Sequence, residues 1–521
     1  MNLLIEILAI LVIGLYSVAL LFIFSYSVAQ LNLVVVYLKN KRTDRTKKPG
    51  QRLAVGEEPV VTVQLPIYNE VYVAERLLDC ISKLDYPGPK LQIQVLDDST
   101  DETAELIHKK VRDLQRKGFD IQHVRRPERE GFKAGALSYG LQFARGEFIA
   151  IFDSDFLPEK DFLKKTIPSF TDMAVGVVQT RWEHLNKNYS LLTRLQAFGL
   201  DAHFSIEQKG RNAGHHFINF NGTAGVWRKR CIEDSGGWQS DTLTEDLDLS
   251  YRAQLKGWKF LFVEEVCAPA ELPVTMNALK NQQYRWNKGA AECVRKNLPK
   301  VFRQKNLSWG TKLHAVFHLT NSTLFVAVMI TALLSIPMMV IKHHFPQFHF
   351  LFLYASFFLV GFLLLGVFYF IAMAQREKQF PHNLAKFIHR FPVFLSVSMG
   401  LALHNATAVI EGYAGKKTSF IRTPKFNIIS SQQSWRSNKY LKGGVTWMTL
   451  FEGLLFLYFA SGILLAFYLA DYGLVPFHLM LMFGFGIVFY YSMIHSGGSV
   501  TNPKNLLKQE KLFAEKIIPA H

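Results

Sequence analysis

Cysteine is scarce in this chain of 521 residues, which contains four copies and no CxxC pair. A scaffold held by disulfides and a zinc site built from paired cysteines are therefore excluded. All four fall between residues 57 and 312, where a reduced, cytosolic segment with buried thiols is the simplest expectation. They are Cys80, Cys231, Cys267 and Cys293.

Internal repeats and low-complexity segments are also missing, and so is the pattern of a cleaved signal peptide. The N-terminal apolar stretch, residues 3–38, is too long for a signal peptide, lacks a basic start and contains Glu6. We expect this stretch to be a membrane anchor that is retained in the protein.

Acidic residues are fewer than basic ones: 42 Asp and Glu stand against 59 Lys and Arg, and the formal net charge is +17. Much of the excess lies directly beside apolar segments, where positive charge marks the cytoplasmic side and attracts anionic lipid. A plain solvated run of charge is the alternative, and nucleic-acid binding is not expected. The run after the first apolar stretch consists of Lys39, Lys41, Arg42, Arg45, Lys47, Lys48 and Arg52.

Long apolar runs are plentiful outside residues 57–312, which read as an ordinary soluble α/β sequence. A helix needs about 20 apolar residues to cross a bilayer. Five segments meet that length and predict membrane spans. They cover residues 3–38, 313–341, 349–374, 445–470 and 474–494.

A sixth apolar segment, residues 391–413, is interrupted by His404, Asn405 and Glu411. Such a pattern favours an amphipathic helix lying in the membrane interface. With five spans the N-terminus lies outside, and residues 57–312, 375–444 and 496–521 lie inside. The basic residues expected inside agree with this orientation. They are Arg376, Lys378, Lys386, Lys416, Lys417, Lys504 and Lys508.

The chain is therefore expected to divide into a membrane anchor, a basic cytoplasmic linker, a cytosolic catalytic domain, two membrane helices, an interfacial helix with a loop, two further membrane helices and a cytoplasmic tail. The boundaries expected are 1–38, 39–56, 57–312, 313–374, 375–444, 445–495 and 496–521.

Residues 57–312 alternate between strand and helix patterns. Strands are expected at 60–65, 91–96 and 148–152, and Ser99 with Glu102 forms a capping-box pattern before a helix that closes at Gly118. Polar residues follow the strand ends, where open parallel sheets bind ligands. The pattern predicts a Rossmann-like, nucleotide-binding α/β domain.

Carboxylates follow two of these strands. Asp97 and Asp98 are placed to accept hydrogen bonds from a base and a ribose, although an Asx-turn or a helix cap would also suit them. Asp153 and Asp155 form a DxD pair, and carboxylate oxygens suit a hard divalent cation that bridges a diphosphate. A purely structural pair is the alternative. Lys133 is a candidate second cation for the diphosphate, or else an ordinary solvated lysine.

Thr244, Glu245 and Asp246 precede a predicted helix over residues 247–256. A carboxylate at a helix N-terminus is kept ionised by the helix dipole, as a general base requires. A plain N-cap is the alternative reading.

Gln282 to Trp286 opens an amphipathic, basic stretch that runs toward Arg303. In the functional reading Arg285 turns toward phosphate and Trp286 offers a platform for a sugar ring. The alternative is a helix lying on the membrane surface.

In this order the motifs read D…DxD…TED…QxxRW, which resembles the signature of processive family 2 glycosyltransferases. Residues 59–301 resemble the plant cellulose-synthase-like A and C proteins, which make β-1,4-mannan and β-1,4-glucan backbones, and are similar to bacterial cellulose synthase catalytic subunits. Three further stretches carry the likeness, at residues 178–182, 191–196 and 220–227. The resemblance implies a GT-A catalytic domain inserted between transmembrane helices.

The resemblance also implies roles for individual residues. Asp97 and Asp98 would bind the nucleoside, Asp153 and Asp155 would hold Mg²⁺ or Mn²⁺, and Asp246 would be the catalytic base. The remaining positions divide between the two substrates. Lys133 and Arg285 would contact the donor, and the acceptor would meet Phe220, Asn221, Gly222, Thr223, Gln282 and Trp286.

A further likeness lies at residues 420–425, which resemble the FxVTxK gating loop of cellulose synthases. Phe420, Thr423 and Lys425 match, whereas Arg422 replaces the valine and Pro424 stiffens the loop. A basic cytoplasmic loop is the alternative. The tail after residue 494 is too short for the cyclic-dinucleotide-binding barrel of bacterial cellulose synthases, so regulation of that kind is not expected.

These observations predict a membrane-integrated, inverting β-glycosyltransferase that builds a β-1,4-linked polysaccharide and passes it to the membrane part. The donor expected is UDP-glucose or GDP-mannose, with UDP-glucose slightly favoured, and the acceptor is the growing glycan. Membrane lipids are expected partners, and homodimerisation stays open. The alternatives are a non-processive enzyme that makes a glycolipid and a non-catalytic transporter or scaffold.

Overall fold

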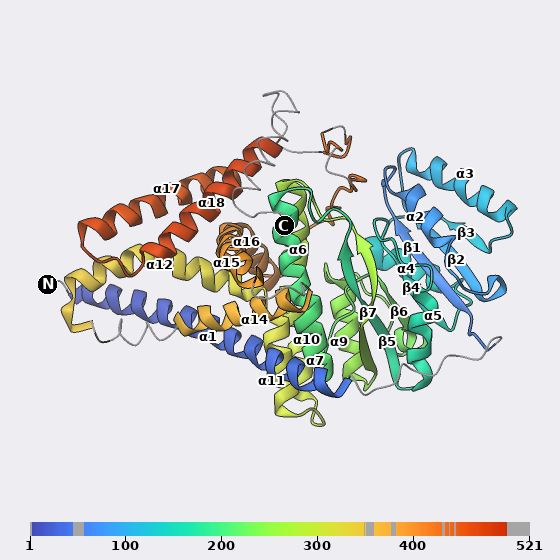
Figure 1. Ribbon diagram of the computed structural model, residues 1–521, viewed down its shortest axis with the longest axis horizontal. Coiled ribbons are helices and arrows are strands. Elements are labelled where there is room, and N and C mark those ends of the chain that lie inside the picture. Colours follow the sequence, from blue (N-terminus) through green and yellow to red (C-terminus); the bar gives the residue numbers. More distant parts are fainter. Residues whose placement is uncertain are drawn as a thin grey trace.

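The computed structural model describes residues 3–44, 57–348, 350, 359–376, 382–429, 433–436, 438–441 and 444–496. Figure 1 shows an α/β domain beside a bundle of long helices, with α6 and α10 between the two. The basic residues expected at 45–52, 378, 504 and 508, and the predicted tail after Ser496, lie outside the described residues.

The α/β domain is built on a sheet of seven strands in the order β3-β2-β1-β4-β6-β5-β7. Strands β3, β2, β1 and β4 are parallel, β6 runs antiparallel to both β4 and β5, and β5 is parallel to β7. The three strands expected from the sequence are confirmed, within a more mixed sheet. The bounds are β1 (Val61–Ile67), β2 (Leu91–Asp97), β3 (Ile121–Val124), β4 (Phe148–Ile151), β5 (Val175–His184), β6 (Gly225–Arg228) and β7 (Lys259–Ala270).

Helices cover both faces of this sheet. Because side chains alternate along a strand, Phe148 and Ala150 of β4 face one apolar core, and Ile149 and Ile151 face the other. Both cores are closed by short helices, which leave the strand ends open. These helices are α2 (Ala74–Ile81), η1 (Gly88–Lys90), α3 (Thr103–Arg116), α4 (Phe132–Leu141), α5 (Phe162–Thr166), η2 (Ile167–Thr171), α8 (Lys229–Asp234) and α9 (Glu245–Leu255).

The capping box expected before α3 is wrong. The helix begins at Thr103, whose backbone N–H donates to Asp101 Oδ1 at 3.0 Å. Ser99 Oγ instead accepts from the backbone N–H of Asn69 at 2.9 Å. Ser99 therefore joins the loops that follow β1 and β2.

Several helices lie between the sheet and the bundle (Figure 1). They are α6 (Leu191–Ala202), the π-helix η3 (His203–Gln208), α7 (Lys209–Ala213), α10 (Met276–Arg303), α11 (Trp309–Leu319), α15 (His382–Gly400) and α16 (Ala402–Tyr413). α10 starts six residues before the predicted amphipathic stretch, so Gln282 to Trp286 lie in its second and third turns.

Five helices of the described part are long and apolar enough to cross a membrane. They are α1 (Leu3–Asp44), α12 (Thr323–His344), α14 (Leu359–Arg376), α17 (Trp447–Tyr468) and α18 (Val475–His495). After α12 comes the short turn η4 (Pro346–Phe348).

The span expected from residue 313 is wrong at its start. α11 ends at Leu319, and a turn separates it from α12, which begins at Thr323. α11 turns polar side chains onto the α/β domain: His318 Nδ1 hydrogen-bonds Tyr251 Oη at 2.9 Å. Hydropathy alone predicted one span over both helices, because α11 is apolar on the side that faces away from the α/β domain.

The single interfacial helix expected at residues 391–413 is also wrong, because α15 and α16 divide it with a bend of 50°. Arg376, six residues before α15, pairs with Glu183 of the α/β domain at 2.6 Å. At the other end Glu411 lies 3.6 Å from Lys288 of α10. The end of α14 and the end of α16 therefore contact the α/β domain and α10, respectively.

Candidate active site

A cavity of about 190 Å³ opens at the carboxyl ends of β1, β2 and β4. α9, α10 and residues 420–425 form its other walls. Most side chains that the sequence singled out meet in this one cavity. They are Asp98, Lys133, Asp153, Asp155, Asn221, Gly222, Asp246, Gln282, Arg285, Trp286, Phe420, Thr423 and Lys425.

Three of the expected site residues lie behind the wall instead. Asp97 is only 1 % exposed, and its carboxylate hydrogen-bonds the backbone N–H of Ser99 and the ring of His123, both at 2.8 Å. The Asx-type alternative therefore describes Asp97, whereas Asp98 faces the cavity.

Phe220 and Thr223 also support the site from behind. Phe220 is fully buried against Trp227, with ring centroids 5.4 Å apart. Thr223 Oγ1 accepts a hydrogen bond from the backbone N–H of Asp153 at 2.9 Å. These two residues hold the loop and the DxD segment together, and neither lines the cavity.

Three side chains around Asp98 had no sequence signal of their own. Arg126 donates to both carboxylate oxygens of Asp98, at 2.8 and 2.6 Å. The guanidinium of Arg129 lies 3.5 Å from the ring centroid of Tyr68, and both residues line the cavity. Together Tyr68 and Arg129 form a flat, cationic surface suited to a nucleobase.

The two DxD carboxylates face two lysines. Lys133 Nζ lies 2.5 Å from Asp153 Oδ1, and Lys425 Nζ lies 2.8 Å from Asp155 Oδ2. The other oxygen of Asp155 is buried and has no hydrogen-bond partner.

This donor set suits a hard divalent cation. Two carboxylates stand in the cavity, each paired with a lysine, and Asp155 has a second oxygen without a partner. The described residues contain no group of three or more side-chain ligands for a metal. Water and donor oxygens would therefore complete the coordination of Mg²⁺ or Mn²⁺.

Asp246 lies at the N-terminus of α9, beside Gly222. A Cβ on Gly222 would stand 3.0 Å from Asp246 Oδ2 and 3.4 Å from Lys133 Nζ, and the φ of Gly222 is +77°. Only glycine suits that backbone and leaves the carboxylate open to the cavity.

The expectation that the helix dipole keeps Asp246 ionised is only partly met. The backbone N–H of Leu247 donates to Asp246 Oδ1 at 2.8 Å, which favours the carboxylate. Burial, and then the charge of Glu245, outweigh this and raise the pKa of Asp246 to about 7. A group with that pKa is poised to exchange a proton near neutral pH.

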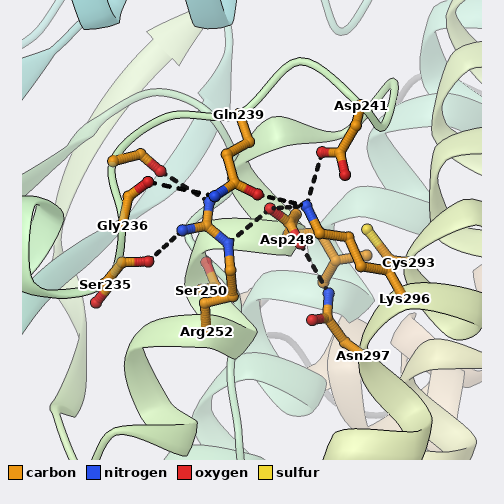
Figure 2. Close-up of polar contacts among 12 residues, drawn as sticks. Ser235, Gly236, Gln239, Asp241, Asp248, Ser250, Arg252, Cys293, Lys296 and Asn297 are labelled. Atoms are coloured by element: carbon orange, nitrogen blue, oxygen red, sulfur yellow. Dashed lines mark hydrogen bonds and ion pairs between the residues drawn. The ribbon is translucent and has the colours of Figure 1, made fainter.

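A buried polar network ties α9 to α10, as Figure 2 shows around Asp248. Asp248 accepts hydrogen bonds from Arg252, Lys296 and Asn297 at 2.8–3.0 Å. Arg252 also donates to the carbonyl oxygens of Ser235 and Gly237. Lys296 also donates to Gln239 and Asp241, so residues on both sides of Asp246 are fixed to the helix that carries Arg285 and Trp286.

α10 approaches the Thr244 backbone closely at Gly289. A Cβ there would lie 2.8 Å from the backbone nitrogen of Thr244. One turn later Glu292 accepts from the backbone N–H of Leu243 at 2.7 Å. These contacts set the distance between the TED and QxxRW motifs, and no sequence pattern predicted them.

Two tryptophans form part of the cavity wall. Trp286 and Trp182 both line the cavity, with ring centroids 6.4 Å apart at an angle of 51°. Flat aromatic faces pack on sugar rings without fixing them at one position. Trp182 belongs to residues 178–182, which resemble the plant cellulose-synthase-like proteins, but the sequence predicted no role for it.

The segment that resembles the gating loop crosses the cavity. We call the described residues among 418–441 the strap. Phe420 stacks on Phe132 with centroids 5.6 Å apart, and the Arg285 guanidinium lies 4.5 Å from the Phe420 ring. Arg285 also donates to Thr423 Oγ1 at 2.8 Å.

The strap is anchored to the α/β domain at two points. Glu271 accepts from the backbone N–H groups of Phe426 and Asn427, at 2.8 and 2.9 Å. Further along, Lys439 lies 3.1 Å from Asp101. Before the first anchor Arg422, which replaces the family's valine, pairs with the buried Glu70 at 3.0 Å. That departure is therefore a specific contact of this chain.

Residues 59–289 match the family model described as "Glycosyltransferase like family 2". These residues form a family 2 glycosyltransferase domain. The domain has the GT-A fold, with a mixed sheet between helices, and apolar helices flank it. The fold class expected from the sequence is confirmed.

Relatives in plants support the resemblance to the cellulose-synthase-like proteins. "Probable glucomannan 4-beta-mannosyltransferase 4" of Oryza sativa subsp. japonica is 44% identical over 264 residues, which are 50% of this chain and 48% of the relative. "Glucomannan 4-beta-mannosyltransferase 2" of Arabidopsis thaliana is 39% identical over 295 residues, 55% of each chain. This chain spans about half the length of the curated relatives it matches.

A solved structure shares the fold. It is a mannosyltransferase, PcManGT from Pyrobaculum calidifontis, in complex with GDP-Man and Mn²⁺. The TM-score is 0.51 and the identity 19%, over 76% of this chain and 100% of that one. The likeness extends to the arrangement of the fold and no further.

Proposed function

We propose that this protein is a membrane-integrated, inverting glycosyltransferase that adds hexose units from a nucleotide sugar to a β-1,4-linked glycan. The observation that carries the proposal is the cavity itself. Asp246 opens on it beside Gly222, and its lining includes the DxD carboxylates and the ring pair of Trp182 and Trp286. The cavity thus offers a base, a diphosphate site and a sugar platform.

On the donor side, Tyr68 and Arg129 receive the base, and Asp98 accepts hydrogen bonds from the nucleoside. Lys133 and Arg285 attract the diphosphate oxygens and offset the charge that builds up as the glycosidic bond breaks. A divalent cation bound at Asp153 and Asp155 would neutralise the leaving nucleoside diphosphate further.

On the acceptor side, a hydroxyl of the terminal sugar lies against Asp246, on the open side of the carboxylate beside Gly222. Asp246 takes its proton, and the oxygen attacks the anomeric carbon opposite the leaving diphosphate. One displacement inverts the configuration, so an α-linked donor gives a β-linked product. Burial keeps the proton on Asp246 until solvent removes it.

GDP-mannose is the donor that we propose. UDP-glucose was slightly favoured from the sequence because it is common among bacterial relatives. The plant relatives, at 44% and 39% identity over about half of this chain, carry the name glucomannan 4-beta-mannosyltransferase instead. That name favours GDP-mannose.

We also propose that the product passes to the membrane part. Trp286 belongs to α10, which packs along α16 and lies between the α/β domain and the bundle (Figure 1). A chain leaving the aromatic wall on that side meets the helices rather than the cytosol. Membrane lipids would surround those helices.

Incubating the purified protein separately with GDP-mannose, UDP-glucose and UDP-N-acetylglucosamine tests this function. We expect GDP release and a β-1,4-linked mannan from GDP-mannose. Linkage analysis and product length decide the outcome. A single sugar attached to lipid would establish the glycolipid alternative, and no turnover of any donor would support a non-catalytic role.

A further inference from the structure

The Asn221 carboxamide carries an unsatisfied donor in the cavity wall. Its Nδ2 is buried and has no hydrogen-bond partner. Its Oδ1 faces two groups, Asn219 Nδ2 at 2.6 Å and His203 Nε2 at 3.4 Å. A buried donor without a partner is destabilising, so a bound group that accepts a hydrogen bond from it relieves that cost.

His203 belongs to the π-helix η3, which neither the motifs nor the proposed chemistry uses. Its Nδ1 lies 2.8 Å from Glu207 Oε2. Glu207 also accepts from Gln30 Nε2 of α1 at 2.7 Å. A chain of hydrogen bonds therefore runs from the helix α1 to the loop beside Asp246. Single π-turns are frequent at functional sites.

Glu207 is held as a carboxylate. Burial alone would raise its pKa, but Arg211 and the hydrogen bonds from His203 and Gln30 lower the pKa to about 2. An ionised carboxylate only accepts hydrogen bonds, so His203 Nδ1 carries a hydrogen. Donation from Nε2 to Asn221 Oδ1 requires a hydrogen there as well, so this contact belongs to the doubly protonated ring, which forms an ion pair with Glu207.

Asn219 has a fixed orientation too. Tyr251 Oη donates to His318 Nδ1, which leaves His318 Nε2–H to donate to Asn219 Oδ1 at 3.2 Å. Asn219 Nδ2 then donates to Asn221 Oδ1. With its oxygen held by Asn219 and His203, Asn221 has only its Nδ2 group left to offer a ligand.

We propose that His203 is a positioning residue for the acceptor: with Glu207 behind it, it fixes the Asn221 carboxamide so that Nδ2 donates to a hydroxyl of the acceptor sugar beside Asp246. The inference rests on the proposed function and adds residues from η3 and α1 to it. The adjoining Gly222 lies directly against Asp246 Oδ2, so a sugar held by Asn221 presents its hydroxyl to the base.

The test compares two reactions of the full chain with GDP-mannose. Without added acceptor, GDP release reports donor binding and transfer to water. With β-1,4-mannohexaose, incorporation of mannose reports the acceptor. In His203→Phe we expect the acceptor KM to rise about tenfold, the worth of one hydrogen bond, while the Kd of GDP changes less than twofold. Asn221→Asp, which replaces the donor by an oxygen, should do the same.

Two variants make the result specific. His203→Gln keeps a group that can donate to Asn221 Oδ1, and it should restore the acceptor KM to within threefold of the wild type. Ser205→Ala lies in the same π-helix, removes a buried hydroxyl without a hydrogen-bond partner, and should leave both reactions unchanged.

An unchanged acceptor KM in His203→Phe overturns the inference. So does an equal loss in acceptor KM and GDP affinity, since a merely structural residue would disturb both sites. Failure of the proposed function looks different, because the wild type itself would then release no GDP from GDP-mannose.

Discussion

The proposed reaction depends on one carboxylate, that of Asp246, as its base. Asp246→Asn keeps the shape and the hydrogen bond from the Leu247 backbone but cannot take a proton. We expect turnover to fall by about 10²–10⁴, the worth of a positioned base, with the Kd of GDP unchanged. Steady-state rates and nucleotide titration measure the two effects. Turnover near the wild-type level would remove Asp246 from the role of base.

The pKa of Asp246 predicts the pH profile. Because burial and Glu245 raise this pKa to about 7, Asp246 is protonated below that pH and ionised above it. A base must be ionised, so kcat/KM should rise with pH through about 7 and then level off.

Glu245→Gln provides the control for that profile. The substitution removes the neighbouring negative charge that helps to raise the pKa of Asp246. The midpoint of the pH profile should therefore move to lower pH. A midpoint that stays in place would show that another group controls the profile.

Sequence patterns predict single residues well where the local chain determines their place. Asp98, Asp153 and Asp246 each follow a strand or begin a helix, and all three reach the cavity. Arg126 could not be found in this way because it meets Asp98 from a loop 28 residues further on. Pairing across such distances depends on the sheet order, which no local pattern contains.

One side chain of the α/β domain holds two backbone groups of the strap. Glu271 accepts from the backbone N–H groups of Phe426 and Asn427, so Glu271→Ala should loosen the strap around these two residues. We expect faster hydrogen exchange at Phe426 and Asn427 and faster proteolysis of the strap. Glu265→Ala, at an exposed position of β7, the strand that ends just before Glu271, is the matched control. Equal protection in both variants would show that other contacts close the strap.

Helices and strands were predicted best where the pattern of apolar residues continues without interruption from one end of the element to the other. The strands around β1 and the spans α17 and α18 are found within three residues of their expected starts. α11 and α12 were merged, and α15 and α16 were expected as one helix. His318 of α11 packs on Tyr251 of the α/β domain, and Gly400, at the bend between α15 and α16, lies against Gly484 of α18. Hydropathy does not register such partners.

The whole molecule has a predicted orientation that labelling can test. Gln347 follows α12, and Ser419 lies in the strap; both are exposed. Cysteines introduced there, in a chain whose four native cysteines are replaced by serine, should react with an impermeant reagent from opposite sides of the membrane. Gly88, exposed on the α/β domain, gives a reference that should label with Ser419. Labelling of positions 347 and 419 from one side would contradict the five-span arrangement.

Lys425 of the strap forms an ion pair with Asp155 of the candidate cation site, although the two residues are far apart in the sequence. In the donor-free protein Lys425→Met should bind Mn²⁺ about tenfold more tightly, because it removes the ammonium that pairs with Asp155. Electron paramagnetic resonance of free Mn²⁺ measures the affinity, and Lys417→Met is the control for charge alone. Equal Mn²⁺ binding in both variants would show that Lys425 does not pair with Asp155 in solution.

The double anchoring of the strap has a further consequence. Lys425 competes with a metal ion for Asp155 and is tethered beside it by the strap. Its local concentration at Asp155 is therefore set by the length of the tether, and it is in the millimolar range for short flexible tethers. Dilution of the protein cannot weaken it, whereas a free cation competes only through its own concentration. A donor diphosphate supplies additional oxygen ligands and shifts that balance toward the cation. The protein would then take up its cation together with the nucleotide sugar, and the resting cavity would hold its own positive charge.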